Sequence, residues 1–121
     1  MRTYEGVTAQ VMQHIEKTYG CRPEYLWTKL DCAAIRHKEN KKWFAVLMHD
    51  LPKTKLGVQK NETADILNLK RDPILDMIDH AHIFPAYHMN KEHWISVILD
   101  ETTDLEMLYV LIEMSFRLTK K

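Results

Sequence analysis

The 121-residue sequence has few of the residues that mark a specialised fold or compartment. It contains two cysteines, three glycines and four prolines, and no run approaches the roughly 18 apolar residues of a membrane-spanning helix. Three glycines leave little scope for a glycine-rich phosphate loop. Cys21 and Cys32 are too few and too far apart for a zinc knuckle or a redox pair, which predicts free thiols. The first 17 residues lack the apolar stretch of a secretory signal, so we expect a cytoplasmic protein outside the membrane.

A net charge is also absent, because 17 Lys and Arg residues balance 17 Asp and Glu residues. The distribution is nevertheless uneven. Residues 36–60 carry seven basic and two acidic side chains, a net +5, whereas residues 61–121 carry six basic and eleven acidic ones, a net −5. Such asymmetry indicates either a charged partner or lysine-rich solvated turns.

The hydrophobic pattern predicts one domain, residues 1–121, with an amphipathic helix at each end. We expect strands at 32–36, 43–48, 64–70 and 94–100, a short helix at 72–81, and a loop around Pro85. In the last helix, Thr103 and Glu106 have the spacing of a capping box. The prediction is an α+β two-layer sandwich, in which the terminal helices and the short middle helix pack on one antiparallel sheet.

Two basic turns separate the predicted strands, at residues 38–42 and 51–63, and both are expected at the same end of the sheet. Lysine and arginine side chains in such turns contact phosphates, which positions a nucleic acid without reading its sequence. The candidate nucleic-acid-binding residues are Arg36, Lys38, Lys41, Lys42, Lys53 and Lys55.

The segment AYHMNKEHW, residues 86–94, gathers polar side chains where a loop enters a strand. Asn90 is expected to cap a tight turn by bonding the backbone N–H near His93, and Trp94 to begin the strand. This structural interpretation leaves His88, Lys91 and His93 as contacts for an anion or another ligand.

Metal and enzyme chemistry find little support in the residue pattern. His80, His82, His88 and His93 lack the three or four convergent ligands of a zinc site, so we expect no metal and no cofactor. Cys32 and Ser96 lie inside apolar strands and not on the sharp exposed turn of a catalytic nucleophile. We therefore expect no enzyme and no catalytic residue.

The stretch FPAYHMNKEHWISVILD resembles the MmcQ/YjbR family of small bacterial proteins, in which a H-x-N-K-x-H-W core precedes an apolar strand that ends in Asp. The core residues here are His88, Asn90, Lys91, His93 and Trp94. The likeness extends to KWFAVLMHDLPKTKLG, DILNLKRDP and EMSFRLT, and so spans roughly residues 20–119.

The resemblance implies a two-layer α/β sandwich related in shape to frataxin-like and secretion-chaperone-like proteins. Members of the family are commonly described as DNA-binding because the fold contains a double-wing arrangement. The segment 52–63 is longer and more basic than the corresponding turn in shorter members of the family. The family brings no catalytic residues to transfer.

Two functions follow as expectations. The first is non-catalytic DNA binding, in which basic hairpin turns contact the phosphate backbone. The alternative is a protein-interaction or chaperone-like module with no nucleic-acid role, for which Met107 and Met114 would give the last helix an adaptable surface. We expect a monomer and not an obligate oligomer.

Overall fold

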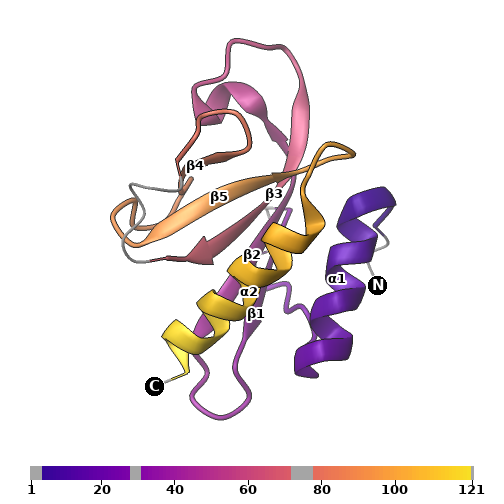
Figure 1. The fold of residues 1–121 in the computed structure, drawn as a ribbon, viewed down its shortest axis with the longest axis vertical. Helices are drawn as coiled ribbons and strands as arrows, with labels where there is room; N and C mark the ends of the chain where they lie inside the picture. The colour runs from indigo at the N-terminus through magenta and orange to yellow at the C-terminus, as the bar shows by residue number, and fades with distance from the viewer. Residues whose placement is uncertain (1–3, 28–30, 72–77, 121) are drawn as a thin grey trace.

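Two helices pack on one face of a five-stranded antiparallel sheet in the computed structural model, which describes residues 4–27, 31–71 and 78–120 (Figure 1). The strands are ordered β1-β2-β3-β5-β4, and every neighbouring pair is antiparallel. This arrangement confirms the predicted α+β sandwich. The elements in chain order are α1 (Gly6–Tyr19), β1 (Cys32–Arg36), β2 (Trp43–Pro52), the 3-10 turn η1 (Lys53–Leu56), β3 (Thr63–Lys70), β4 (Ile83–Pro85), β5 (Trp94–Leu99) and α2 (Leu105–Thr119).

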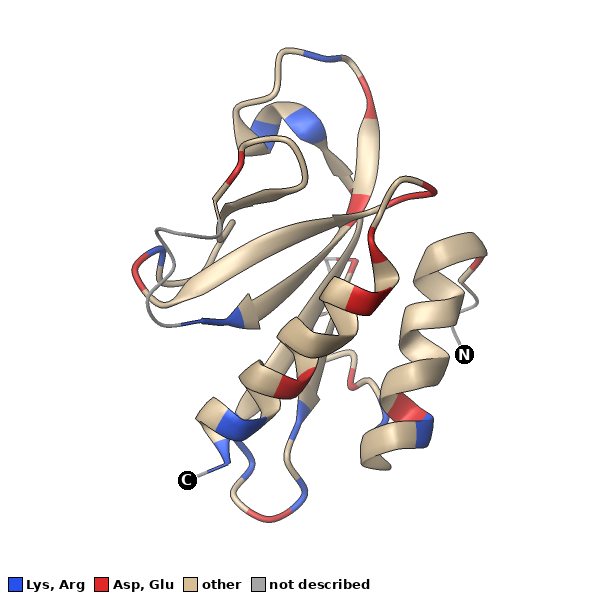
Figure 2. Cartoon of the chain, viewed as in Figure 1, with Lys and Arg blue, Asp and Glu red and all other residues tan. Residues whose placement is uncertain are grey.

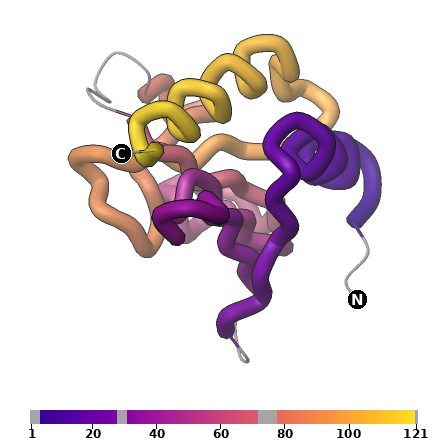
Figure 3. Tube along the Cα trace, turned by 90° about the horizontal axis from the view of Figure 1, so that it is seen from below, coloured from indigo at the N-terminus to yellow at the C-terminus, as the bar shows by residue number. Residues whose placement is uncertain are grey.

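The main core lies between the sheet and the helices. Alternate residues of the strands point into it, because successive side chains of a strand face opposite sides of the sheet. The core includes Ala45, Leu47, Leu67, Leu69, Ile95 and Val97 from the sheet and Val11, Ile15, Leu108 and Ile112 from the helices, all fully or almost fully buried. Seen along the sheet from below, α2 lies over the strands with α1 beside it (Figure 3).

Polar contacts join the two helices at their exposed side. The His14 ring stacks on the Tyr109 ring with centroids 3.7 Å apart. The Tyr19 hydroxyl donates a 2.8 Å hydrogen bond to Glu113, and this bond, together with one from Arg117, holds the pKa of the Glu113 carboxyl below its ordinary value. Gly20 ends α1 in the left-handed conformation, with φ of 67°, as its position in the sequence indicated.

The second face of the sheet carries a smaller core. Met48, Ile66, Phe84 and Ile98 are buried there against side chains of the connecting loops, among them Trp27, Leu56 and Tyr87. Strand β2 is therefore covered on both faces, which explains its uninterrupted apolar run and confirms it as an inner strand.

The structure corrects three expectations about the connections. Residues 83–85, expected in a loop, form the edge strand β4, where Pro85 is tolerated because it lies at the sheet edge. The expected loop 51–63 instead continues β2 to Pro52 and then forms η1. Most of the short helix expected at 72–81 lies outside the described residues, and residues 78–81 are not helical.

Both cysteines are buried and free, in agreement with the sequence. Within the part of the chain that the structure describes, neither helix combines the length and the apolar character needed to cross a membrane.

Candidate nucleic-acid interface

The six basic residues predicted to bind DNA fall into two groups at opposite ends of β2 (Figure 2). Arg36, Lys38, Lys41 and Lys42 surround the β1–β2 turn, whereas Lys53 and Lys55 lie in η1, beyond the other end of the strand. Ten residues of strand span about 33 Å. The expectation that both turns share one end of the sheet is therefore wrong, because consecutive turns of an antiparallel meander alternate between its ends.

The group in η1 offers little free charge. Lys53 is largely buried, and its Nζ lies 3.4 Å from a carboxylate oxygen of Glu62. Lys55 is exposed. Asp50 and Asp65 lie near the same end of β2, which further reduces the positive potential there.

The opposite end, which we call the hairpin end, comprises the turn 37–42 and the neighbouring residues Lys70, Trp94 and Lys120. Lys38, Lys41, Lys42 and Lys120 are exposed. Within the described residues, Lys38, Lys41 and Lys120 form no ion pair with a carboxylate. The hairpin end thus carries a cluster of exposed lysines, of which Lys38, Lys41 and Lys120 are open to a ligand.

Arg36 differs from these lysines. Its guanidinium makes a bidentate pair with Glu24, through hydrogen bonds of 2.7 and 2.8 Å. Because two of its five N–H donors bond Glu24 and the charge is offset, Arg36 contributes less to the positive surface than the sequence suggested.

The hairpin turn is fixed against the last turn of α2. Asn40 donates a 2.9 Å hydrogen bond to the backbone carbonyl of Thr119, and its side-chain oxygen accepts one from the Lys42 N–H. His37 is buried and its Nε2 lies 2.7 Å from Thr119 Oγ1. Burial lowers the pKa of His37, which favours the neutral ring in this apolar position. These bonds hold Lys120 beside the lysines of the turn.

Two tryptophans border the same lysines. A shallow groove at the hairpin end is lined by Lys41, Lys42, Trp43, Lys70, Trp94 and Thr119. Lys70 pairs with Trp94 across strands β3 and β5. Since their neighbours Leu69 and Ile95 point into the helix-side core, Lys70 and Trp94 face the opposite side of the sheet. The groove therefore combines cationic and aromatic surface.

Trp43 also borders a second, more apolar groove of about 260 Å³ on the face of the sheet away from the helices. The Trp27 and Trp43 rings meet edge to face there, with centroids 5.4 Å apart. Met48, His88 and Met89 complete its walls. The two grooves meet at Trp43, so aromatic surface continues from the lysines onto the sheet face.

The segment 86–94 turns as expected, with one difference in its bonds. The Asn90 side chain accepts from the Glu92 N–H at 2.8 Å, and the Asn90 backbone carbonyl accepts from His93 and Trp94. The side-chain cap therefore falls one residue before the predicted one. His88 has a positive φ of 61° and is exposed with Lys91, whereas His93 is half-buried. His88 thus remains available to a ligand.

A buried polar network, which sequence reasoning missed, anchors this segment to the sheet. Ser96 Oγ donates to Asn68 Oδ1, and Asn68 Nδ2 donates to the Tyr87 carbonyl at 3.0 Å. The Tyr87 N–H closes the ring of bonds by donating to Ser96 Oγ at 2.9 Å. Asn68 and Ser96 are both fully buried. A single polar residue in each of two otherwise apolar strands was the sequence signal that could have indicated this network.

The fold and the site define a class: small α+β proteins with an open antiparallel sheet that presents lysines and tryptophans at one end. The profile of the YjbR family matches residues 16–118, and the chain belongs to this family. The match agrees with the resemblance expected over residues 20–119.

Known relatives agree with this assignment. The chain is 45% identical over 113 residues to the uncharacterised protein YyaQ of Bacillus subtilis, covering 91% of this chain and 95% of YyaQ. A crystal structure of a Pseudomonas syringae protein, 40% identical, superposes with a TM-score of 0.86 over 91% of this chain and 96% of its own. A Deinococcus radiodurans protein, 21% identical, shares the fold with a TM-score of 0.65 over 90% of this chain and 78% of its own.

Proposed function

We propose that the protein binds single-stranded DNA at the hairpin end and catalyses no reaction there. The observation that carries this proposal is the groove in which Lys41, Lys42 and Lys70 lie beside Trp43 and Trp94. Phosphates would contact the lysines and bases would stack on the tryptophans, which is how sequence-tolerant single-strand binders combine charge and aromatic surface.

The charge distribution supports the phosphate contacts. Three arginines near this end, Arg22, Arg36 and Arg117, pair with nearby glutamates. Lys38, Lys41 and Lys120 form no ion pair with a described carboxylate and can meet a phosphate chain, and Lys42 and Lys70 line the same groove. Lysine contacts of this kind neutralise phosphates and carry no sequence information.

The aromatic surface supports a single strand over a duplex. Trp43 and Trp94 are half-buried, so part of each indole is accessible. Stacking of a base on an aromatic side chain contributes about 1–3 kcal/mol and requires an unpaired base, which a duplex does not offer. Lys91 lies in the turn that leads into Trp94 and would add a further phosphate contact.

The test is a comparison of two matched charge reversals in a fluorescence-anisotropy titration with a single-stranded oligonucleotide. Lys41→Glu/Lys42→Glu alters the groove, whereas Lys55→Glu/Lys60→Glu changes the charge equally at exposed lysines beyond the other end of β2. We expect the first variant to lose at least about tenfold in affinity and the second to bind within about twofold of the native protein.

Three results would contradict the proposal. The native protein would fail to bind at low salt, both variants would lose affinity equally, or duplex DNA would bind as tightly as the single strand. Circular dichroism spectra of the variants, matching that of the native chain, show that the changed lysines act through charge and not through unfolding.

A protein partner is the second candidate, and one observation favours it. A shallow apolar groove of about 440 Å³ runs between α1 and α2, lined by Tyr19, Tyr109, Val110 and Met114. Val110 is 58% exposed beside Tyr109 and Met114, so this groove offers contiguous apolar surface that a partner could cover. Val110→Lys would abolish binding of such a partner and leave DNA binding unchanged, which separates the two functions.

A further inference from the structure

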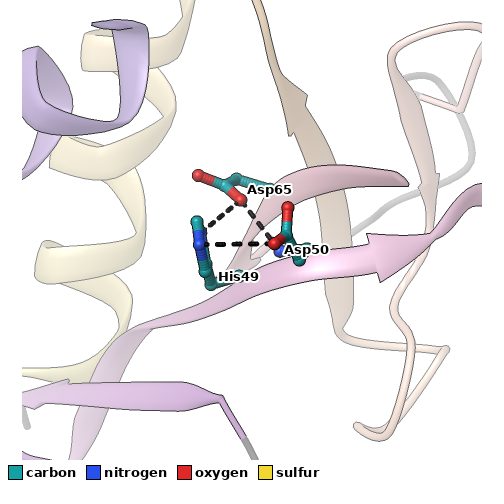
Figure 4. Close-up of side chains that lie close together, drawn as sticks. All are labelled: His49, Asp50 and Asp65. Carbon is teal, nitrogen blue, oxygen red and sulfur yellow. Dashed lines mark hydrogen bonds and ion pairs between the residues drawn. The ribbon is translucent and has the colours of Figure 1, made fainter. Parts of the chain in front are cut away.

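Three metal-ligating side chains meet at the other end of β2, away from the lysines and tryptophans. One ligand atom from each of His49, Asp50 and Asp65 lies within 4.8 Å of the other two (Figure 4). None of the three belongs to the groove proposed to bind DNA. The cluster therefore requires an explanation of its own.

A β-bulge brings these residues together. Met48 pairs with Ile66 and Leu51 with Ala64, so His49 and Asp50 together stand opposite the single residue Asp65. Asp50 takes up the extra length with a positive φ of 52°. In a regular strand, neighbours such as His49 and Asp50 would face opposite sides of the sheet, whereas here both side chains approach Asp65.

Asp65 is the fixed centre of the cluster. Its side chain is 13% exposed. One carboxylate oxygen accepts from the Thr8 hydroxyl of α1, and the other accepts a 2.9 Å hydrogen bond from the Asp50 N–H. Bonds of this kind orient a carboxylate ligand before a metal arrives.

The imidazole of His49 lies between the two carboxylates. Its Nδ1 is 2.7 Å from Asp65 Oδ1 and its Nε2 is 3.6 Å from Asp50 Oδ2. Although the first distance is short, Nδ1 is buried from solvent and lacks the geometry of a hydrogen bond to any described residue. The imidazole thus directs one ring nitrogen toward each carboxylate, and the three side chains form a compact set of nitrogen and oxygen ligand atoms.

We propose that His49, Asp50 and Asp65 bind a divalent transition metal of the Zn²⁺ type. One imidazole nitrogen and two carboxylate oxygens suit Zn²⁺, whereas Ca²⁺ and Mg²⁺ prefer oxygen ligands throughout. A divalent ion also neutralises the two negative charges of the carboxylates, whereas an imidazolium would neutralise only one of them. Three protein ligands leave the remaining position of a tetrahedral site to water.

Binding would join the helix layer to the sheet. Thr8 belongs to α1 and bonds Asp65 of β3, so a metal on Asp65 fixes a contact that already links the two. Because the ligands come from positions 49, 50 and 65, the site exists only in the folded chain. The metal would therefore stabilise the native state by an amount that grows with its concentration.

The test is a calorimetric titration of tag-free, chelator-treated protein with Zn²⁺, together with thermal unfolding at several Zn²⁺ concentrations. We expect saturable binding of one ion per chain and an unfolding temperature that rises with Zn²⁺. Asp50→Asn should weaken binding by at least about tenfold, by analogy with the loss of supporting groups at metal sites. The Asp50 side chain is 69% exposed, and Asn tolerates its positive φ, so this variant is expected to fold.

His49→Gln is the second variant, and His88→Gln is the control because His88 is an exposed histidine outside the cluster. Loss of binding in His49→Gln with native affinity in His88→Gln supports the site. The proposal is overturned if the native protein takes up no Zn²⁺, if both cluster variants bind as tightly as the native protein, or if His88→Gln loses the binding.

Discussion

At the scale of single residues, His37 connects the lysine turn of the hairpin end to the rest of the fold. It is 5% exposed and packs against the rings of Phe44 and Phe116. His37 Nε2 lies 2.7 Å from the Thr119 hydroxyl, which also lies 2.8 Å from the Ser115 carbonyl of α2. The ring therefore joins the lysine turn to the end of α2.

Acid should destabilise the folded chain at His37, because the charged ring is unfavourable in its buried site. Burial lowers the pKa of His37 from its ordinary value of 6.5, so the unfolded chain binds the extra proton more readily than the folded one. The stabilisation is complete above about pH 6.5 and is lost as the pH falls through the folded pKa. Urea unfolding at a series of pH values should show a free energy of unfolding that falls from pH 7.5 to 5.

His37→Gln keeps a donor for Thr119 but cannot titrate, so its free energy of unfolding should fall less over the same pH range. Burial also lowers the pKa of His14, but His14 is present in both proteins and its contribution cancels in the comparison. Identical pH dependence in the native protein and in His37→Gln would contradict this account of the ring.

The sequence indicated which residues of the hairpin end are charged but not which of them are free. Arg36 and Lys41 have the same formal charge, yet Glu24 engages the first and Lys41 forms no ion pair with a described carboxylate. Asn68 and Ser96 are separated by 28 positions, and His37 and Thr119 by 82. Contacts at such separations depend on the whole fold, which local patterns do not specify.

At the scale of elements, the two helices and four of the strands were predictable from the sequence, whereas the irregular connections between them were not. The helices and four strands follow from hydrophobic periodicity. The bulge at His49 and Asp50 and the edge strand β4 depend on pairing with other strands, so they leave little local signal.

The start of α2 illustrates how local signals compete. Thr103 and Glu106 have capping-box spacing, but the helix begins at Leu105 with Asp104 as its N-cap, and Asp104 accepts from the Met107 N–H at 3.1 Å. Thr103 instead closes the tight turn after β5, where it accepts from the Asp100 N–H and donates to the Ile98 carbonyl. The predicted capping box is therefore wrong, because the turn uses the Thr103 hydroxyl.

Asp104→Ala should lower the free energy of unfolding by about 1 kcal/mol, since it removes an N-cap acceptor from an exposed helix start. Asp104→Asn is the matched control, because Asn caps about as well as Asp and should cost little. Urea denaturation of the three proteins measures both values. Equal losses in the two variants would show that the side-chain cap contributes nothing.

At the scale of the whole molecule, the antiparallel order of the strands places the two groups of lysines at opposite ends of the sheet. The β1–β2 turn and the β2–β3 connection alternate between the two ends of the sheet, so lysines that are neighbours in the sequence separate in space (Figure 2). Lys70, Trp94 and Lys120 come from distant positions and join the hairpin end. A zero net charge over the chain thus coexists with a basic end.

The most direct test of the proposed function is the salt dependence of single-stranded DNA binding. If about four phosphates are neutralised at the hairpin end, the slope of log affinity against log salt should be about −3. Removing the contacts of Lys41 and Lys42 by reversal to Glu should reduce the slope to about −1.4, and Lys55→Glu/Lys60→Glu should keep the native value. A native slope near zero, or the same slope in both variants, would contradict phosphate binding at the hairpin end.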